Sequence, residues 1–466
     1  MSRPRPTQGP LRSLLVLVLL STLGVAAAQT GSVVLFTLPA EAVIDLPAAG
    51  VQGAVKTGDV WRADGVPVGE HELRVRAGQA EHRVTVRVLD GAVSRVAVNL
   101  LLLPSQAWTE VPADQVGDVI ALAAGAESSY ALRTDGTVVA WGRNQRGQFG
   151  DGSDTGQRVP TVVAGIDRVT GIAAGHAHLL LLRDDGSVWA AGWNREGQLG
   201  NGTRDDQAVP VRVEGLAGVV QIAAGPSFSL ALTGDGHVWA WGTNDSRQLG
   251  DGSRTTRPTP VQAPLSGVRA IAAGDRFALA LTHEGRVWAW GSNVFGQLGD
   301  GTTTAHERPV QVGGLDRVTA IAAGADFAVA LREDGSLWSW GRNANGRLGD
   351  GGGDDRATPA PVVGLGDVRE IVVGWTHALA ITRTGELWAW GHNASGMLGD
   401  GTRTERNRPQ PVGGIPPIAL AAAGQNHTLA VGVDGSLWAW GSNGHGRLGD
   451  GTTSFRESPA AVAWPP

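Results

Sequence analysis

The sequence contains no cysteine and only one lysine, Lys56. The absence of cysteine excludes disulfides, thiolate nucleophiles, cysteine-ligated zinc and a lipid-modified N-terminal cysteine. The scarcity of lysine removes amine chemistry, such as Schiff-base formation, from most of the chain. The formal net charge is −6, and no basic block is present. Because nucleic-acid binding requires a cationic stripe, we expect no nucleic-acid partner.

Catalytic signatures are missing as well. No HExxH, P-loop, G-x-S-x-G or paired-histidine zinc pattern occurs in the sequence, and each of these would have indicated a metal, a phosphate or a nucleophile. The Asp, Glu and His residues are scattered and form no constellation. We therefore predict no catalytic residue, no metal site, no cofactor and no enzymatic activity.

The chain has little that could span a membrane. Residues 14–20 read LLVLVLL, after Arg3, Arg5 and Arg12 and before three alanines at 26–28. This order is typical of a secretory signal peptide, whereas an uncleaved anchor would need about 20 apolar residues. We predict a signal peptide at residues 1–28. The protein is then exported to the periplasm, the cell envelope or the medium, with no membrane span after cleavage.

Glycine is abundant, with 69 residues, and many recur at fixed positions. The copies of one such glycine are spaced by 49 or 50 residues: Gly142, Gly192, Gly242, Gly291, Gly341, Gly391 and Gly441. Each repeat holds four short strand candidates, and an Asp-Gly pair between the second and third predicts a tight hairpin. Four antiparallel strands in each of seven repeats predict an all-β, seven-bladed β-propeller over residues 117–464.

The repeats resemble the regulator-of-chromosome-condensation repeat family. The resemblance rests on long segments, such as IAAGDRFALALTHEGRVWAWGSNVFGQLGDGT (271–302) and VVGWTHALAITRTGELWAWGHNASGMLGDGT (372–402). It implies the propeller fold. The namesake of the family promotes guanine-nucleotide exchange on a small GTPase, an activity tied to a wedge inserted in one blade. Every repeat here is 49 or 50 residues long, so no such wedge is visible and we do not expect that activity.

Residues 31–103 are predicted to form a small separate domain, followed by a linker at 104–116. Polar and apolar residues alternate in EHELRVR (70–76) and HRVTVRV (82–88), which indicates half-buried strands of an antiparallel β-sandwich. GSVVLFTLPAEAVIDL (31–46) and VPVGEHELRV (66–75) resemble the PEGA domain of bacterial envelope proteins, although the turn glycine of that family is replaced by Leu46. The resemblance implies an envelope-facing accessory module.

Several recurrent residues are interpreted as structural. Aromatic residues two apart, such as Trp288 and Trp290, point to one face of a strand and are expected to pack between blades. The asparagine at Asn144 and its six equivalents is expected to satisfy backbone groups of its turn. The L-G-D-G acids lie in different blades and are expected to cap Asx turns; they are Asp151, Asp251, Asp300, Asp350, Asp400 and Asp450, with Asn201 in the same slot.

Three histidines are also interpreted as structural. His178, His377 and His427 occupy a repeat position that holds phenylalanine in other repeats, at Phe228, Phe277 and Phe327. A position that accepts phenylalanine is not a metal ligand, so we expect buried histidines there.

The repeats differ most in two turns that we expect on one face of the propeller, because turns of an up-and-down blade alternate between faces. Aromatic residues and arginines in such turns are typical interface anchors. The binding candidates are Trp193, Trp375, Phe295, Arg143, Arg146, Arg195, Arg276, Arg342, His176 and His392. The alternative is unconstrained loop variation, with the aromatic side chains folded onto the rim.

We therefore predict an exported, monomeric, non-enzymatic propeller that recognises a protein or an envelope polymer through this face, as an inhibitor or an envelope adaptor. The alternative is an enzyme or regulator, either an exchange factor by family analogy or a hydrolase at the channel mouth. Ionisable groups with perturbed pKa values clustered at that mouth would favour the hydrolase.

Overall fold

The computed structural model describes residues 119–163 and 165–463 in full, together with the backbone of eight strands between residues 14 and 100. The chain divides into two compact units, Met1–Glu110 and Val111–Pro466. Among the described residues, no helix is both long and apolar enough to cross a membrane.

The N-terminal unit contains two antiparallel sheets. One has the order β4-β5-β2-β1-β8 and the other the order β3-β6-β7. The strands are β1 (Leu14–Leu19), β2 (Thr30–Phe36), β3 (Val43–Asp45), β4 (Val55–Thr57), β5 (Val60–Pro67), β6 (Gly69–Ala77), β7 (Ala80–Val88) and β8 (Val96–Leu100). The alternating segments 70–76 and 82–88 pair as β6 and β7. The sandwich arrangement, the PEGA resemblance and the signal peptide remain predictions, and the linker lies outside the described residues.

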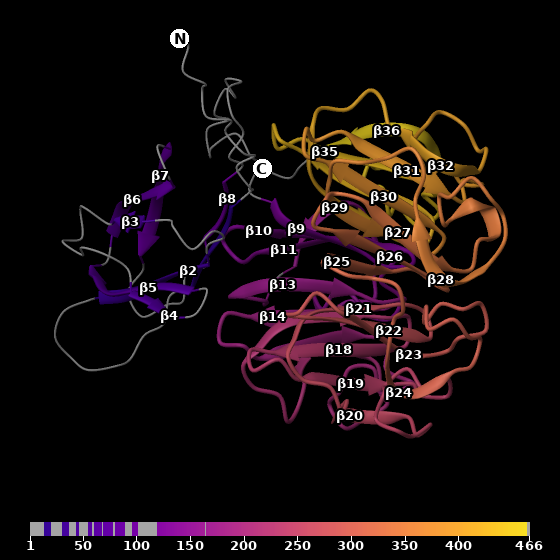
Figure 1. The fold of residues 1–466 in the computed structure, drawn as a ribbon, viewed down its shortest axis with the longest axis horizontal. Helices are drawn as coiled ribbons and strands as arrows, with labels where there is room; N and C mark the ends of the chain where they lie inside the picture. The colour runs from indigo at the N-terminus through magenta and orange to yellow at the C-terminus, as the bar shows by residue number, and fades with distance from the viewer. Residues whose placement is uncertain are drawn as a thin grey trace, which may run out of the picture. The chain divides into compact units, whose positions relative to one another are not determined.

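The C-terminal unit confirms the seven-bladed propeller, with seven four-stranded sheets (Figure 1). Each blade comes from one repeat, and its strands follow one another from the channel outward. Blades 1 to 3 are β9 (Val119–Ala124), β10 (Ser128–Arg133), β11 (Val138–Gly142), β12 (Gln157–Val162); β13 (Val169–Ala174), β14 (His178–Arg183), β15 (Val188–Gly192), β16 (Gln207–Arg212); and β17 (Val219–Ala224), β18 (Phe228–Thr233), β19 (Val238–Gly242), β20 (Arg257–Gln262).

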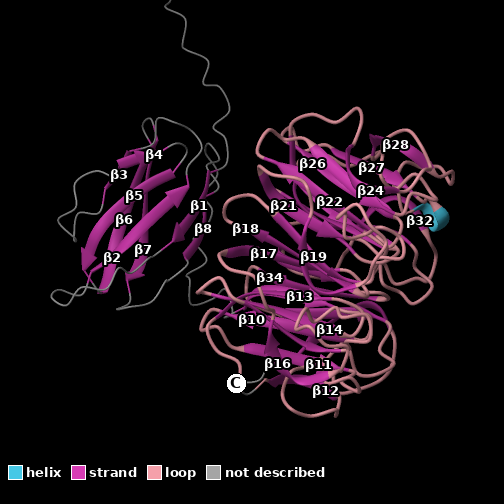
Figure 2. Cartoon of the chain, turned by 90° about the horizontal axis from the view of Figure 1, so that it is seen from below, coloured by secondary structure: helices cyan, strands magenta, loops and turns pink. Residues whose placement is uncertain are grey.

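Blades 4 to 7 repeat this order. They are β21 (Val268–Ala273), β22 (Phe277–Thr282), β23 (Val287–Gly291), β24 (His306–Gln311); β25 (Val318–Ala323), β26 (Phe327–Arg332), β27 (Leu337–Gly341), β28 (Arg356–Pro361); β29 (Val368–Val373), β30 (His377–Thr382), β31 (Leu387–Gly391), β32 (Arg406–Pro411); and β33 (Ile418–Ala423), β34 (His427–Gly432), β35 (Leu437–Gly441), β36 (Arg456–Val462). Blade 5 also contains the 3-10 turn η2 (Ala344–Gly346), drawn in cyan beside β32 in Figure 2.

The ring closes blade to blade, without an exchanged strand. In every blade the last glycine of the L-G-D-G segment, or of its variants F-G-D-G in blade 1 and L-G-N-G in blade 2, donates its amide to a carbonyl in the outer strand of the next blade, as from Gly152 to Ala208 at 2.8 Å. The equivalent hydrogen bond links blade 7 to blade 1, from the Gly451 amide to the Arg158 carbonyl at 2.9 Å. Two segments of the sequence, around Trp108 and around Ala460, could supply an outermost strand. Ala460 lies in β36, which pairs with β35 of blade 7, and Trp108 lies outside the described residues.

Each outer strand carries a proline near its middle, where an edge strand would otherwise offer an amide to another chain. Proline cannot donate to a ladder and is tolerated at sheet edges. The seven residues are Pro160, Pro210, Pro260, Pro309, Pro359, Pro409 and Pro459.

The core consists of one apolar cluster between each pair of blades. The tryptophan at the end of the third strand is fully buried there, as at Trp290, and Trp288 packs against the same cluster. The indole N–H of Trp290 donates to the carbonyl of Gln248 in the preceding blade, at 2.9 Å. Blade 2 has Ala191 at this position, and blade 1 has Phe149 where the other blades have leucine. Phe149 packs in the apolar cluster between blades 1 and 2.

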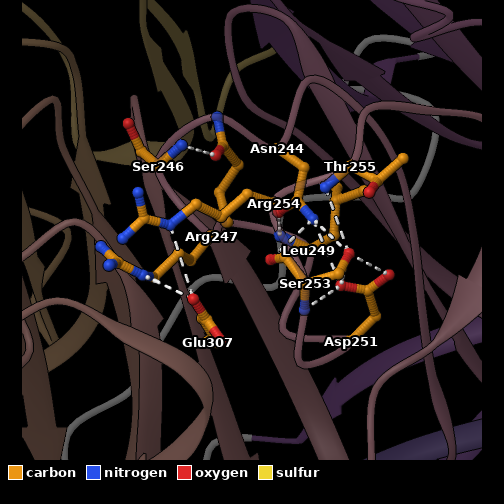
Figure 3. A network of polar contacts seen from close by, with 10 residues as sticks. Asn244, Ser246, Arg247, Leu249, Asp251, Ser253, Arg254, Thr255 and Glu307 are labelled. Atoms are coloured by element: carbon orange, nitrogen blue, oxygen red, sulfur yellow. Dashed lines mark hydrogen bonds and ion pairs between the residues drawn. The ribbon is translucent and has the colours of Figure 1, made fainter.

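The recurrent asparagine stabilises the long loop between the third and fourth strands. In blade 3 the Asn244 side chain donates to the Ser253 carbonyl at 3.1 Å and accepts from the Leu249 amide at 3.0 Å (Figure 3). Asp251 accepts from the Ser253 amide at 2.9 Å, which is an Asx turn. Both structural interpretations from the sequence are therefore confirmed.

The three histidines are buried and pair with a hydroxyl of the next blade. The Nε2 atoms of His178, His377 and His427 lie 3.1, 3.1 and 2.9 Å from the hydroxyl oxygens of Ser229, Thr428 and Ser129. Where the position holds phenylalanine, the residue opposite is alanine, at Ala278, Ala328 and Ala378, and both pack in one apolar cluster. Burial lowers the pKa of His178 and His377 to about 3. These imidazoles are therefore neutral core residues, as predicted.

Candidate functional site

The two variable turns of each repeat lie on one face of the propeller, which we call the variable-loop face. The amide of Arg143 donates to the carbonyl of Glu127 at 2.9 Å, and that of Trp193 to Ala177 at 2.8 Å. The Asp-Gly hairpins lie at the other end of the blades, where the Gly186 carbonyl accepts from the amide of Val219. The sequence-based placement of the two turns is confirmed.

The turns after the first strands surround the mouth of the central channel. A chain of backbone hydrogen bonds links neighbouring blades there, including Asp275 N to Ala325 O at 3.1 Å and Ala325 N to Trp375 O at 2.9 Å. The circuit lacks the bond from blade 3 to blade 4, because Pro226 has no N–H. The channel behind the mouth is a cavity of about 80 Å³, lined mainly by alanine and glycine and, at its opening, by Pro226, Asp275 and Trp375.

An aromatic cluster covers part of this mouth. The rings of His176 in blade 2 and Trp375 in blade 6 have centroids 5.5 Å apart, and the Trp193 ring lies 6.5 Å from that of His176. All three side chains are half-buried. Burial lowers the pKa of His176, so its imidazole is mainly neutral at pH 7. The aromatic side chains are thus folded onto the rim, yet they join two blades that are far apart in the sequence.

A cluster of charged residues lies beside His176, at the closure between blades 7 and 1. Glu127 forms an ion pair with Arg143 and a second with Arg447 at 3.2 Å. His445 Nε2 lies 3.6 Å from Glu127 Oε1, but burial lowers the pKa of that imidazole. Burial alone would raise the pKa of Glu127, but the Arg143 hydrogen bond and the neighbouring cations lower it overall. Arg447 is 5% exposed and also donates to the Ala126 carbonyl. The charge of Glu127 is therefore fully compensated.

A second cluster lies on the opposite side of the mouth, in blades 4 and 5. The Arg342 guanidinium stacks over the Phe295 ring, with its central carbon 4.5 Å from the centroid. Arg342 also pairs with Asp326 at 3.4 Å. Next to Phe295, Val294 is 68% exposed. Burial, with a smaller contribution from Asp326, raises the pKa of Asp275 at the mouth.

Sequence comparison identifies the family. The family model described as RCC1-like domain matches residues 91–365 and 167–465. The chain belongs to the RCC1-like domain family. This confirms the resemblance drawn from the repeats. A search of the curated proteins gave no match.

Solved structures show the fold of this RCC1-like propeller in relatives of low sequence identity. Prp20p from Saccharomyces cerevisiae is 24% identical, with a TM-score of 0.64 over 75% of this chain and 88% of that chain; its structure was described with its binding to Gsp1p and histones. Yeast RCC1 (Prp20) bound to Kap60 matches at 24% identity and TM-score 0.63, over 78% and 91%. Human WBSCR16 matches at 23% identity and TM-score 0.62, over 90% and 98%.

The structure separates the predicted binding residues of this RCC1-like propeller into two groups. His176, Trp193, Trp375, Phe295, Arg143, Arg276 and Arg342 surround the channel mouth. The others lie farther out. Arg146 pairs with Asp206 of the next blade at 3.3 Å, His392 lies 3.3 Å from Glu405, and Arg195 is exposed in its loop.

Sequence reasoning missed the acidic members of the mouth. Glu127, Asp275 and Asp326 occupy the same variable turns as the predicted aromatic residues. Their position in those turns was visible in the sequence, but the contacts of Glu127 with Arg447 of blade 7 and of Asp326 with Arg342 of a separate loop depend on the folded arrangement. Within the described residues, no group of three or more His, Cys, Asp or Glu side chains could hold a metal ion.

Proposed function

We propose that this protein is an exported binding propeller that recognises a protein partner through the mouth of the variable-loop face. The observation that carries the proposal is the cluster of His176, Trp193 and Trp375, which blades 2 and 6 build from non-repeating residues. Half-buried aromatic residues at the centre, with arginines and acids around them, match the anatomy of protein interfaces. The family supports the proposal, because the related Prp20p was described with protein partners.

An enzymatic role is the second candidate, because ionisable groups with shifted pKa values do gather at the mouth. These are Asp275, His176 and Glu127. Two features favour binding over catalysis. Glu127 is held by two arginines, Arg143 and Arg447. Among the described residues, neither His176 nor Asp275 makes a side-chain hydrogen bond to a nucleophile, and a general base that activates a nucleophile needs such a bond. We therefore propose a non-enzymatic role.

Capture experiments test the proposed binding face. The mature protein is immobilised and exposed to envelope and culture-medium fractions of the source organism, beside a Trp193→Ala/Trp375→Ala double variant. The matched control is Phe455→Ala, which removes an aromatic residue that is 46% exposed in the loop before β36. We expect the double variant to lose the captured proteins and the control to keep them. Equal capture by all three proteins would contradict the proposed face.

Export is tested separately by fractionation and N-terminal sequencing. We expect a mature chain that begins at Gln29 outside the cytoplasm. A full-length chain confined to the cytoplasm would contradict export but would leave the binding face to be judged by the capture experiment.

A further inference from the structure

The mouth contains a recess between blades 4 and 6. Asp275, Ala325 and Trp375 occupy the same repeat position in three successive blades, and backbone hydrogen bonds of 3.1 and 2.9 Å connect them. All three line the opening of the channel, together with Pro226. Because Ala325 carries only a methyl group, no large side chain from blade 5 at this position separates the carboxylate of Asp275 from the indole of Trp375.

The carboxylate in this recess lacks the compensation that the other acids of the mouth have. Glu127 pairs with Arg143 and Arg447. Asp326 pairs with Arg342. Within the described part of the chain, the one ion pair of Asp275 is with its sequence neighbour Arg276, at 3.7 Å.

That ion pair is weak because Arg276 is mostly in solvent. Its side chain is 65% exposed, whereas the Asp275 side chain is 34% exposed. An exposed pair in water contributes little. The raised pKa of Asp275, caused by burial and by the neighbouring Asp326, agrees with a carboxylate that lacks an adequate counter-charge.

The aromatic side of the recess suits the same kind of ligand. A cation that lies against an indole gains from the negative face of the ring, and more so when it is partly removed from water. His176, which contacts Trp375, supplies no competing positive charge at neutral pH, since burial lowers the pKa of its imidazole. A carboxylate and an indole at one opening therefore complement an ammonium or guanidinium group.

We propose that the recess between Asp275 and Trp375 receives a lysine or arginine side chain of the protein partner. The proposal rests on the proposed function, because it names the chemical group that the mouth of the variable-loop face recognises. The positive group lies beside the carboxylate of Asp275 and against the indole of Trp375. The aliphatic stem of the inserted residue passes between Pro226 and the rim.

The test uses two matched peptides on biosensor surfaces. One is a Gly-Ser peptide with a single central lysine, and the other is the same peptide with that lysine acetylated, which keeps the length and removes the charge. The full mature protein is titrated over both surfaces. Variants are Asp275→Asn, Trp375→Ala and Trp375→Phe, with Asp245→Asn as the matched control, because Asp245 is an exposed acid in a blade 3 loop of the same face. Near-UV circular dichroism confirms that each variant is folded.

We expect the wild-type protein to bind the lysine surface at least about tenfold more tightly than the acetyl-lysine surface, which corresponds to one good charged contact. Asp275→Asn should bring this ratio close to one, while Asp245→Asn should leave it unchanged. Trp375→Ala should weaken binding to the lysine surface, and Trp375→Phe should restore part of the loss because it keeps a ring.

The inference would be overturned by equal binding of both peptides by the wild type, or by a ratio that survives Asp275→Asn. A ratio that falls equally in Asp245→Asn would also overturn it, because general attraction to the acidic protein would then explain the binding. The outcome is separable from the proposed function. If the Trp193→Ala/Trp375→Ala variant loses its captured proteins but the wild type does not distinguish the lysine from the acetyl-lysine peptide, the face binds its partners by another chemistry.

Discussion

The histidine–hydroxyl pairs between blades predict a compensating double substitution. In blade 6, His377 Nε2 lies 3.1 Å from Thr428 Oγ1, and that hydroxyl donates to the Met397 carbonyl at 2.8 Å. Since the hydroxyl proton is used in this way, the oxygen accepts from an Nε2–H group. The neighbouring interface instead pairs Phe327 with Ala378. We predict that His377→Phe/Thr428→Ala converts the first arrangement into the second.

The magnitudes follow from the contacts. Thr428→Ala leaves a buried N–H without its acceptor, which should cost about 1–3 kcal/mol. His377→Phe places a ring carbon against the threonine hydroxyl and should cost about 1–3 kcal/mol by overpacking. In the double variant both penalties disappear, so its free energy of unfolding should lie within about 1 kcal/mol of the wild type. The two single costs sum to about 2–6 kcal/mol, so a double variant close to the wild type implies a coupling of about 2–6 kcal/mol between the two sites.

Urea unfolding of the four proteins at pH 7.5 measures this coupling. Phenylalanine–alanine pairs already exist at other interfaces of this ring, so the double variant tests whether the pair, not each residue, is the unit of packing. If the loss in the double variant equals the sum of the two single losses, the two side chains act independently and the reasoning is refuted.

The same variant carries a pH signature. The pKa of His377 is lowered to about 3 by burial, whereas an unfolded histidine titrates near 6.5. Between these values the unfolded chain binds a proton that the folded chain does not, so stability falls as the pH is lowered, by about 1.4 kcal/mol per pH unit per histidine. Replacing His377 removes one such proton. Relative to the wild type, the double variant should have a higher free energy of unfolding at pH 5 than at pH 7.5. An equal difference between the two proteins at both pH values would contradict this.

Three further predictions concern other parts of the propeller. Glu370 in blade 6 occupies the repeat position that Gln221 occupies in blade 3. The Gln221 side chain forms two hydrogen bonds with the backbone of Ile271 in the next blade. Burial raises the pKa of Glu370. Glu370→Gln should therefore stabilise the fold at pH 7, by about 1 kcal/mol, and this gain should vanish below pH 4, where the acid is neutral in both states; thermal melts at both values check it. Trp340→Ala removes a fully buried ring and its hydrogen bond to the Gln297 carbonyl, and should cost about 3–5 kcal/mol in urea unfolding. Gly274→Ala would place a Cβ 2.1 Å from Phe277 and 2.7 Å from the Gly324 carbonyl, so we expect a lower melting temperature than for Gly353→Ala, a glycine with open space around it.

The fold could be predicted from the sequence because each repeat contains the same pattern of strands and turns. Gly291 and its equivalents marked the blades, and Asn293 and Asp300 were assigned to turns that the structure confirms. Substitutions that compensate one another across blades could not be predicted. The pairing of Phe327 with Ala378, or of His377 with Thr428, depends on the register between sheets that the chain order alone does not give.

The candidate site could be predicted in part for a related reason. Trp193 and Trp375 stood out as large residues in variable turns, but their wide separation in the chain gave no sign that both approach His176. The acids were overlooked because an Asp in a turn is ordinarily solvated. What distinguishes Asp275 from Asp326 is the counter-charge. Asp326 pairs with Arg342 from another loop of its own blade, whereas Asp275 pairs with its exposed sequence neighbour Arg276, and only the three-dimensional arrangement shows this.

The blade-to-blade closure also bears on where the chain can begin. The bond from Gly451 to Arg158 repeats the bond from Gly152 to Ala208, so the boundary between blades 7 and 1 differs little from the other six. No strand has to be borrowed from the far end of the chain to complete a sheet. The propeller domain should therefore tolerate circular permutation, with new termini in the segment between β12 and β13 and a short connection between β36 and β9, because such a chain keeps every four-stranded sheet intact.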